Sequence, residues 1–169
     1  GLALREYSRQ LTAIVLAAMF AGCDTGKEPE TATSTAPIAT AATLGEQIVL
    51  TPVEYLEAAP YKDADRSQGA RQAQICKACH SFDKDGPDMI GPALYGFFGK
   101  EVGSRSAFQY SEAMAEADFI WTPEALDAWL AQPGRFLPGN RMTFAGVLRQ
   151  SDRDDLIAYL LSATADAAD

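Results

Sequence analysis

The sequence Cys76-Lys77-Ala78-Cys79-His80 constrains this chain more than any other feature, because it combines two of the three cysteines with the only histidine. Two thiols three positions apart can each add to one vinyl group of a haem, and the adjacent histidine then ligates the iron. A chain that carries this motif must fold around that group. The motif therefore predicts one covalently attached c-type haem, with Cys76 and Cys79 as attachment points and His80 as an axial ligand.

Three other chemistries use a Cys-x-x-Cys pair. A zinc site needs four ligands, and no cysteine or histidine follows His80. A thioredoxin-like redox pair lies near a βαβ pattern, which this sequence lacks. A structural disulfide between Cys76 and Cys79 remains open for an exported chain, although it would leave His80 without a role.

The composition is that of a globular protein with an acidic balance. Of 169 residues, 47% are hydrophobic and 22% are charged, which excludes wholesale disorder. The net charge of -9, from 14 basic and 23 acidic residues, argues against nucleic-acid binding. Residues 66–163 contain 10 basic and 12 acidic residues, so most of the acidic excess lies outside this segment.

The first 22 residues have the pattern of an export signal. Arg5 and Arg9 precede the apolar stretch 11–22, which has signal-peptide length and is too short to span a bilayer. The stretch ends in F-A-G-C, similar to a bacterial lipobox but with phenylalanine where an aliphatic residue is usual. We expect a signal peptide over residues 1–22 and lipidation of Cys23. The alternative is an ordinary secretory signal followed by an incidental cysteine.

The next two segments differ in their content of large apolar side chains. Residues 23–44 are rich in Thr, Ala, Ser, Pro and Glu, so they cannot offset chain entropy by burial and are expected to form a flexible tether. Residues 45–65 contain a small apolar patch interrupted by Pro52 and Pro60. We expect this N-terminal extension to pack against the main domain, which spans residues 66–164 and is followed by a short tail, 165–169.

The main domain has helical periodicity and turn signals but no convincing alternation with period two, so it is predicted to be all-α. A first helix over 67–77 is expected to have Ser67 as its N-cap. Thr122 and Pro123 mark the start of another helix, which Pro133 stops. The remaining predicted segments are a helical turn at 93–98, a helix at 111–117, a Gly- and Pro-rich loop at 134–146, and a last helix that begins at Ser151.

From about Ser67 to Thr164 the chain resembles class I cytochrome c of the mitochondrial and alphaproteobacterial type. The resemblance implies an all-α fold wrapped around one covalently bound haem, in a small protein that carries single electrons and is not an enzyme. It rests on six segments: Cys76-Lys-Ala-Cys79-His80, Ile90-Gly91-Pro92-Ala-Leu94-Tyr-Gly96, Phe108-Gln-Tyr110-Ser-Glu-Ala-Met114, Ile120-Trp121, Pro138-Gly-Asn-Arg-Met142-Thr-Phe144-Ala-Gly146 and Asp155-Leu-Ile-Ala-Tyr-Leu160.

The second axial ligand is expected to be a methionine, because His80 is the only histidine. Met19 lies in the signal, and Met89 follows His80 by only nine residues, which leaves little chain to reach the opposite haem face. Met114 lies in a predicted helix, where core filling is the simpler role. Met142 lies on an irregular loop and matches the family's Pro-Gly-x-x-Met pattern. We therefore predict His80/Met142 ligation, and soft sulfur raises the reduction potential.

The resemblance also implies roles for residues around the haem. Pro92 matches the proline whose carbonyl accepts the histidine Nδ1–H bond. Tyr110 and Trp121 match residues that bond a buried haem propionate, although core packing alone would also explain Trp121. Four positions depart from the family pattern: Trp129 stands for a Tyr beside the methionine sulfur, Asn140 for a Thr, Lys100 for an Arg near the propionates, and Met114 for an Asn.

These features predict a membrane-tethered, periplasmic, single-haem carrier on the bacterial inner membrane. The resemblance implies electron transfer from a quinol–cytochrome c oxidoreductase to a terminal oxidase or photosynthetic reaction centre. The alternatives are a fixed haem subunit of a larger membrane complex and a haem peroxidase. A peroxidase would need an open sixth site and an acid–base residue, and the chain has no spare histidine. A basic rim around the haem edge would steer docking; its candidates are Lys77, Lys100, Arg135, Arg141 and Arg149.

Overall fold

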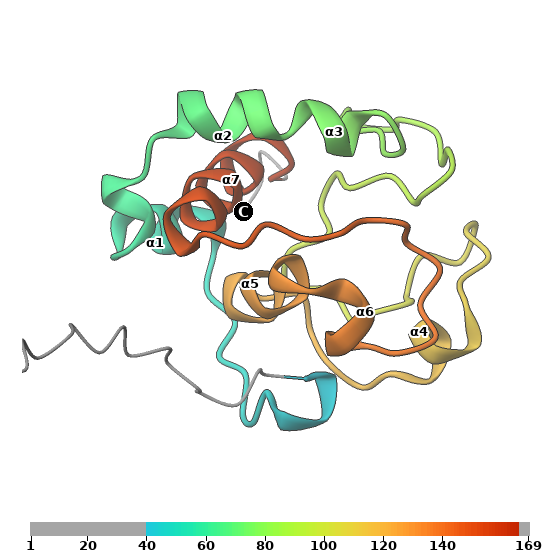
Figure 1. Ribbon diagram of the computed structural model, residues 1–169. Helices are drawn as coiled ribbons and strands as arrows, with labels where there is room; N and C mark the ends of the chain where they lie inside the picture. The colour runs from blue at the N-terminus through green and yellow to red at the C-terminus, as the bar shows by residue number, and fades with distance from the viewer. Residues whose placement is uncertain (1–39, 166–169) are drawn as a thin grey trace, which may run out of the picture. The chain divides into compact units, whose positions relative to one another are not determined.

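The computed structural model describes residues 40–165, and within this range the regular secondary structure is helical (Figure 1). The expected all-α fold is confirmed: residues 40–165 contain no strand, only an isolated antiparallel bridge between Glu101 and Ile120. No helix in this range is long and apolar enough to cross a membrane. The elements in chain order are η1 (Ala41–Thr43), α1 (Pro52–Glu57), η2 (Tyr61–Asp63), α2 (Arg66–Gln72), α3 (Gln74–Lys77), α4 (Glu112–Glu116), α5 (Pro123–Ala131), α6 (Pro133–Phe136) and α7 (Gln150–Ala163).

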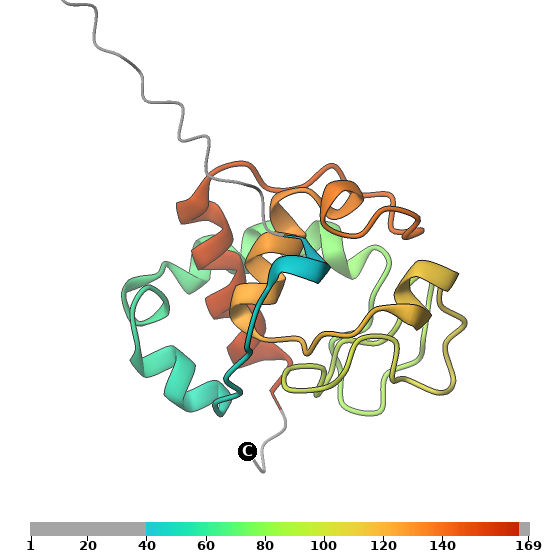
Figure 2. The same ribbon diagram turned by 90° about the horizontal axis from the view of Figure 1, so that it is seen from below.

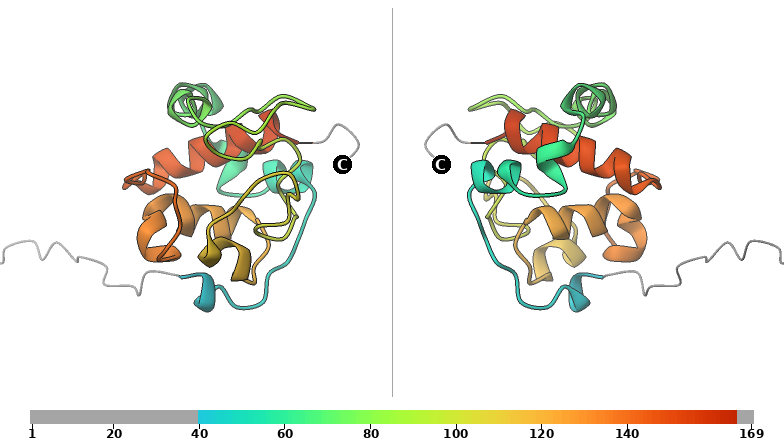
Figure 3. Two further views of the ribbon diagram at one scale, coloured as in Figure 1. Left: turned by 90° about the vertical axis from the view of Figure 1, so that its right-hand side faces the viewer. Right: turned by 90° about the vertical axis from the view of Figure 1, so that its left-hand side faces the viewer.

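The pair α2 and α7 forms the centre of the scaffold. Figure 3 shows α2 nearly end-on while α7 runs across the view, so the two helices cross steeply. The crossing depends on Gly69, because a Cβ at this position would lie 2.0 Å from the backbone oxygen of Asp155. The apolar face of α7 is almost fully buried, with Ile157 and Leu161 at 0% exposure. Close backbone approach and apolar burial together hold this pair.

Helix α5 lies against α7 and carries much of the remaining core. It begins as expected: Thr122 accepts a hydrogen bond from the Ala125 N–H, and Pro123 occupies the first turn. Trp129 and Leu130 on α5 are buried. Arg153 of α7 is also buried and donates to Asp127 of α5 and to the carbonyls of Val147 and Leu148. Arg153 therefore links the loop that precedes α7 to α5 and α7 through hydrogen bonds.

The N-terminal extension adds α1 and η2 to this scaffold (Figure 2). Thr51 and Glu54 form a reciprocal capping box at the start of α1. Tyr55 and Tyr61 are buried and join the core that α5 and α7 share. Burial raises the pKa of both phenols, and the shift is large at Tyr61.

The helix predicted over 67–77 differs from the observed structure in its N-cap and in its continuity. The N-cap is Asp65, not Ser67, because the Asp65 carboxylate accepts from the N–H groups of Ser67 and Gln68 at 2.9 and 3.0 Å. The helix is also divided into α2 and α3 at Ala73. The ψ of Ala73 is -11°, flatter than in a regular α-helix.

Two further expectations are corrected. Residues 93–98 form turns rather than a helical turn. Gly96 has φ +67°, which no right-handed helix accommodates, and its N–H bonds to the Thr164 carbonyl. Helix α5 does end before Pro133, but Pro133 then begins α6 inside the predicted loop, since proline is well tolerated in a first helical turn.

Candidate haem site

The site begins where α3 ends. Cys76 lies in the last turn of α3, and the N–H groups of Cys79 and His80 both donate to its carbonyl, at 3.0 and 2.9 Å. These bonds continue the helical turn through the motif. The sequence-predicted cluster of two thiols and one imidazole is thereby gathered on one compact turn. Neither Cys76 nor Cys79 forms a disulfide; both are free and half-buried.

The ring of His80 is fixed by the segment that contains Gly91 and Pro92. Its Nδ1 lies 2.6 Å from the Pro92 carbonyl oxygen, so Nδ1 carries the proton and donates it. The ring lies directly against Gly91, where a Cβ would come within 2.3 Å of the His80 Cε1. The Gly91 N–H also donates to the Cys79 carbonyl at 2.8 Å. This arrangement leaves Nε2 as the unprotonated nitrogen, which is the form that ligates a metal.

Burial sets the protonation of the motif. It lowers the pKa of His80 below the usual range, against the opposing effect of the Pro92 carbonyl, so the imidazole is neutral at pH 7. Burial also raises the pKa of the Cys76 thiol. A neutral imidazole beside a protonated Cys76 thiol matches the donor set for thioether attachment and axial ligation. No group of three or more His, Cys, Asp or Glu side chains in residues 40–165 could hold a metal ion by itself.

Met142 lies on the chain between α6 and α7, in an extended segment organised by Asn140. The Asn140 amide donates to the carbonyls of Pro133 and Leu137 at 3.0 and 2.8 Å, and its oxygen accepts from the Met142 N–H at 2.9 Å. The Met142 side chain is half-buried against the core. Asn140 therefore fixes the backbone that carries the predicted second ligand, and its own place near the haem stays a prediction.

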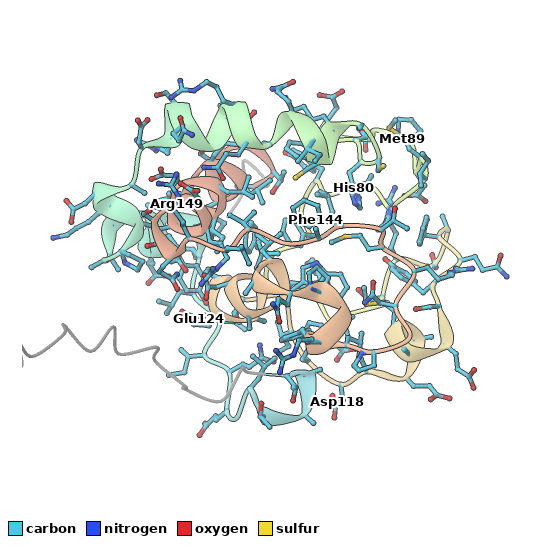
Figure 4. The ribbon with its side chains drawn as sticks, viewed as in Figure 1. His80, Met89, Asp118, Glu124, Phe144 and Arg149 are labelled. Carbon is cyan, nitrogen blue, oxygen red and sulfur yellow. The ribbon has the colours of Figure 1, made fainter. Side chains whose placement is uncertain are left out.

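The two other described methionines occupy different surroundings. Met89 is 48% exposed and lies on the same side as His80 in Figure 4. Its backbone N–H donates to the Gly91 carbonyl, within the segment that supports the His80 ring. Met114 lies on α4 and packs at the edge of the core, as the sequence analysis expects for core filling.

An aromatic cluster lines the interior beside α5. The Trp129 ring lies 5.6 Å from Trp121 and 5.9 Å from Phe136, and Phe119 contacts both Trp121 and Phe136. All these pairs meet edge to face. Trp129 is 3% exposed, whereas Trp121 is half-buried. Core packing is thus observed for both tryptophans, and Trp121 is only partly covered by the protein.

Tyr110 and Lys100 lie on less regular chain. Tyr110 precedes α4, is half-buried and stacks edge to face on Phe108 at 4.9 Å; burial raises its pKa. The side chain of Lys100 is exposed, and its backbone pairs with Trp121. The place near the haem stays a prediction for Tyr110, Lys100 and Trp121.

Asp88 has a structural role that no strong pattern in the sequence predicts. Its carboxylate accepts from the Ala93 N–H at 2.9 Å and pairs with Arg105. The bond from Ala93 and the pair with Arg105 hold the pKa of Asp88 below the usual range. This contact closes the loop that presents Pro92 to His80. The signal in the sequence is weak: an aspartate after Gly86-Pro87, in a position typical of a turn.

The basic rim is partly engaged within the protein. Arg149 forms a two-point ion pair with Asp152, Arg141 donates to the Gln109 carbonyl, and the Lys77 ammonium lies 5.2 Å from the Phe82 ring centroid. Arg135 is exposed on α6. The predicted signal peptide, Cys23 and residues 23–39 of the predicted tether 23–44 lie outside the described residues. The end of that predicted tether is not free chain, because it contains η1, and Ala41 and Leu44 pack against the core.

Comparison with known proteins was made on the whole chain. Residues 67–164 match the family model described as Cytochrome c. The chain is 33% identical over 106 residues to a cytochrome c of Kluyveromyces lactis, covering 62% of this chain and 96% of the relative. It is 44% identical over 100 residues to a cytochrome c homolog of Bradyrhizobium diazoefficiens, covering 59% and 54%. A cytochrome c homolog of Rickettsia prowazekii is 37% identical over 99 residues, covering 59% and 57%. The match thus spans just over half the length of these two bacterial relatives.

Proposed function

The chain belongs to the cytochrome c family, and from this premise we propose that it is a single-haem carrier with His80/Met142 ligation, tethered to the periplasmic side of a bacterial inner membrane. The family assignment makes it an electron carrier, not an enzyme, with one haem c bound covalently through Cys76 and Cys79. The ligand set, the tether and the partners are our proposal. The match to bacterial homologues is compatible with a periplasmic location.

The geometry at His80 is the observation that carries the ligand assignment. The 2.6 Å contact between Nδ1 and the Pro92 carbonyl fixes the ring and leaves Nε2 available to the iron of a haem held by the thiols of the motif. Met142 would supply the opposite ligand from a segment whose backbone Asn140 fixes. The bound iron supplies a reversible one-electron change between Fe(II) and Fe(III).

The protein's own contribution is to hold the two ligands still in a dry site. Gly91 and Pro92 prevent rotation of the His80 ring, and the loop bonds of Asn140 restrain Met142. Trp129 and its aromatic neighbours exclude water from the interior beside them. A site that changes little between oxidation states keeps the reorganisation cost of electron transfer low.

For partners, we propose electron input from a quinol–cytochrome c oxidoreductase and output to a terminal oxidase or photosynthetic reaction centre. The haem-bearing segment 66–163 has a net charge of only -2, against -9 for the chain, so acidic repulsion is weakest there. Because Arg141 and Arg149 are engaged with neighbours, exposed Arg135 and Lys100 are the better candidates for steering a partner.

Haem attachment tests the centre of this proposal. Protein matured in a host that attaches c-type haem should carry one haem that survives acid–acetone extraction and adds one haem mass to the intact chain. Replacing both Cys76 and Cys79 with Ser should make the haem extractable. Haem that extracts freely from the unaltered protein, or zinc bound in its place, would exclude the proposed site.

The anchor is tested at Cys23. Cys23→Ser should move the haem protein from the membrane pellet to the soluble fraction without changing its spectrum, because several acyl chains hold a protein far more firmly than one. Mass spectrometry of the native protein should find a lipid-modified Cys23 at its N-terminus. A soluble native protein with unmodified Cys23 would contradict the proposed lipid anchor. The assignment as an electron carrier would still hold.

A further inference from the structure

Residues 119–121 form a short extended segment whose backbone is held from two sides. On one side it pairs with residues 100–102: the Trp121 N–H donates to the Lys100 carbonyl, and the Val102 N–H donates to the Phe119 carbonyl, both at 2.9 Å. The Gly99 N–H also donates to the Trp121 carbonyl at 2.9 Å. The backbone of Trp121 is therefore fully paired through this side.

Ile120 lies between these bonds, so its own N–H and carbonyl face the other way. One side chain from the N-terminal extension bonds to both groups, and the Ile120 carbonyl also accepts from the Thr122 N–H at 2.8 Å. The Ile120 N–H donates to Gln47 Oε1 at 2.7 Å, and Gln47 Nε2 donates back to the Ile120 carbonyl at 2.7 Å. Gln47 Nε2 also lies 3.3 Å from the Thr122 hydroxyl. The Gln47 amide thus bonds to the backbone edge of 119–121 that does not pair with residues 100–102.

The backbone around Gln47 is itself held by hydrogen bonds, which supports the contact between Gln47 and Ile120. The buried Tyr55 hydroxyl donates to the Ile48 carbonyl at 2.8 Å and accepts from the Leu50 N–H at 3.1 Å. Val49 also packs close to Gly99, where an added Cβ would come within 3.2 Å of the Val49 side chain. The extension therefore contacts both paired segments, 99–102 and 119–121. Figure 2 shows it running past the start of α5.

We propose that Gln47 is a positioning residue that sets the place of Trp121 through the backbone of Ile120. The proposal rests on the proposed function and on the family resemblance, which implies that Trp121 bonds a haem propionate. Trp121 is confined between the paired backbone and the rings of Phe119 and Trp129, at 4.9 and 5.6 Å. Release of one edge of its segment would let the indole shift. The extension would then be part of the haem site and not a passive spacer between the anchor and the domain.

The test uses Gln47→Met in the full-length haem protein, because Met keeps the length of the side chain and removes both amide groups. Amide hydrogen exchange should accelerate at Ile120 by about fivefold or more, as expected for the loss of a hydrogen bond. The reduction potential should shift in the same direction as in Trp121→Phe, by a smaller amount. The far-red band of the ferric protein should persist, because Met142 is untouched.

A matched control separates positioning from loss of stability. Thr51→Val removes the cap of α1 and weakens the same extension without touching Gln47 or Ile120. It should lower the unfolding midpoint as Gln47→Met does, yet leave the potential unchanged.

Two results would overturn the proposal: unchanged exchange at Ile120 in Gln47→Met, or faster exchange there with an unchanged potential while Trp121→Phe does shift it. If Trp121→Phe leaves the potential unchanged as well, the assignment of Trp121 to the haem fails, and the positioning role fails with it. The exchange data then still report whether the Gln47–Ile120 contact exists.

Discussion

The crossing of α2 and α7 and the chain that carries His80, Pro92 and Met142 are held by different physics. The helix pair depends on the close approach at Gly69 and on apolar side chains that are almost wholly buried. The site chain has little regular structure between α3 and α4 and between α6 and α7. It is held by single side chains that bond to backbone groups, above all Asn140 and Asp88. A rigid scaffold thus supports ligands whose positions depend on a few polar contacts.

The largest effect should follow from disturbing the scaffold. Gly69→Val would place side-chain atoms where the backbone of Asp155 lies, so the two helices must separate. We expect a loss of about 3–5 kcal/mol in the free energy of unfolding, as for other overpacked or disrupted cores. Denaturant unfolding measures this. The neighbouring substitution Ala70→Val should cost less than about 1 kcal/mol, and equal losses at the two positions would contradict the close-approach argument.

A smaller and local loss of stability is expected from a substitution at Asn140, in the chain between α6 and α7. Asn140→Ala removes three hydrogen bonds around Met142, each contributing about 0.5–1.5 kcal/mol. Because α2 and α7 are untouched, the cost should appear mainly as easier opening of the sixth ligand position. Added imidazole should bind the ferric Asn140→Ala variant at least about tenfold more tightly than it binds the ferric unaltered protein, as measured by optical titration. Thr143→Ala, one residue from Met142, should leave the titration unchanged; similar effects at Thr143 and Asn140 would reject the specific role of Asn140.

The smallest effect concerns Asp88 and is pH-dependent. Its pKa is lowered in the folded protein by the Ala93 N–H and Arg105, so the ionised form stabilises the loop above about pH 4. This contribution is lost as the pH falls through the folded-state value. The stability difference between the unaltered protein and Asp88→Asn should be less than about 1 kcal/mol at pH 6 and should shrink toward pH 3. Unfolding curves at three pH values measure it, and a difference independent of pH would contradict the assignment.

The scaffold was largely predictable from the sequence. Helix starts follow from local chemistry, such as Thr122 before Pro123, and the apolar face of α7 follows from its periodicity. The error at the first helix arose because two capping residues, Asp65 and Ser67, compete, and the stronger acceptor begins the helix two residues earlier than Ser67 would.

The site was predictable in its chemistry and less so in its supports. The Cys-x-x-Cys-His motif carries its own geometry, and the Pro92 contact to His80 follows the family resemblance. The bonds of Asn140, Asp88 and Gln47 join residues whose partners no local pattern specifies; Gln47 and Ile120 are 73 residues apart. Such contacts are tertiary, so propensity and periodicity do not encode them.

The ligation of iron by Met142 is tested most directly by the weak far-red absorption band of ferric haem with a methionine ligand. The band should be present in the unaltered protein and in Met89→Leu and Met114→Leu, which remove the two other described methionine sulfurs. It should vanish in Met142→Ala, with a lower reduction potential and an open sixth position. A band that persists in Met142→Ala and disappears in either of the other variants would contradict the ligation proposed for this protein.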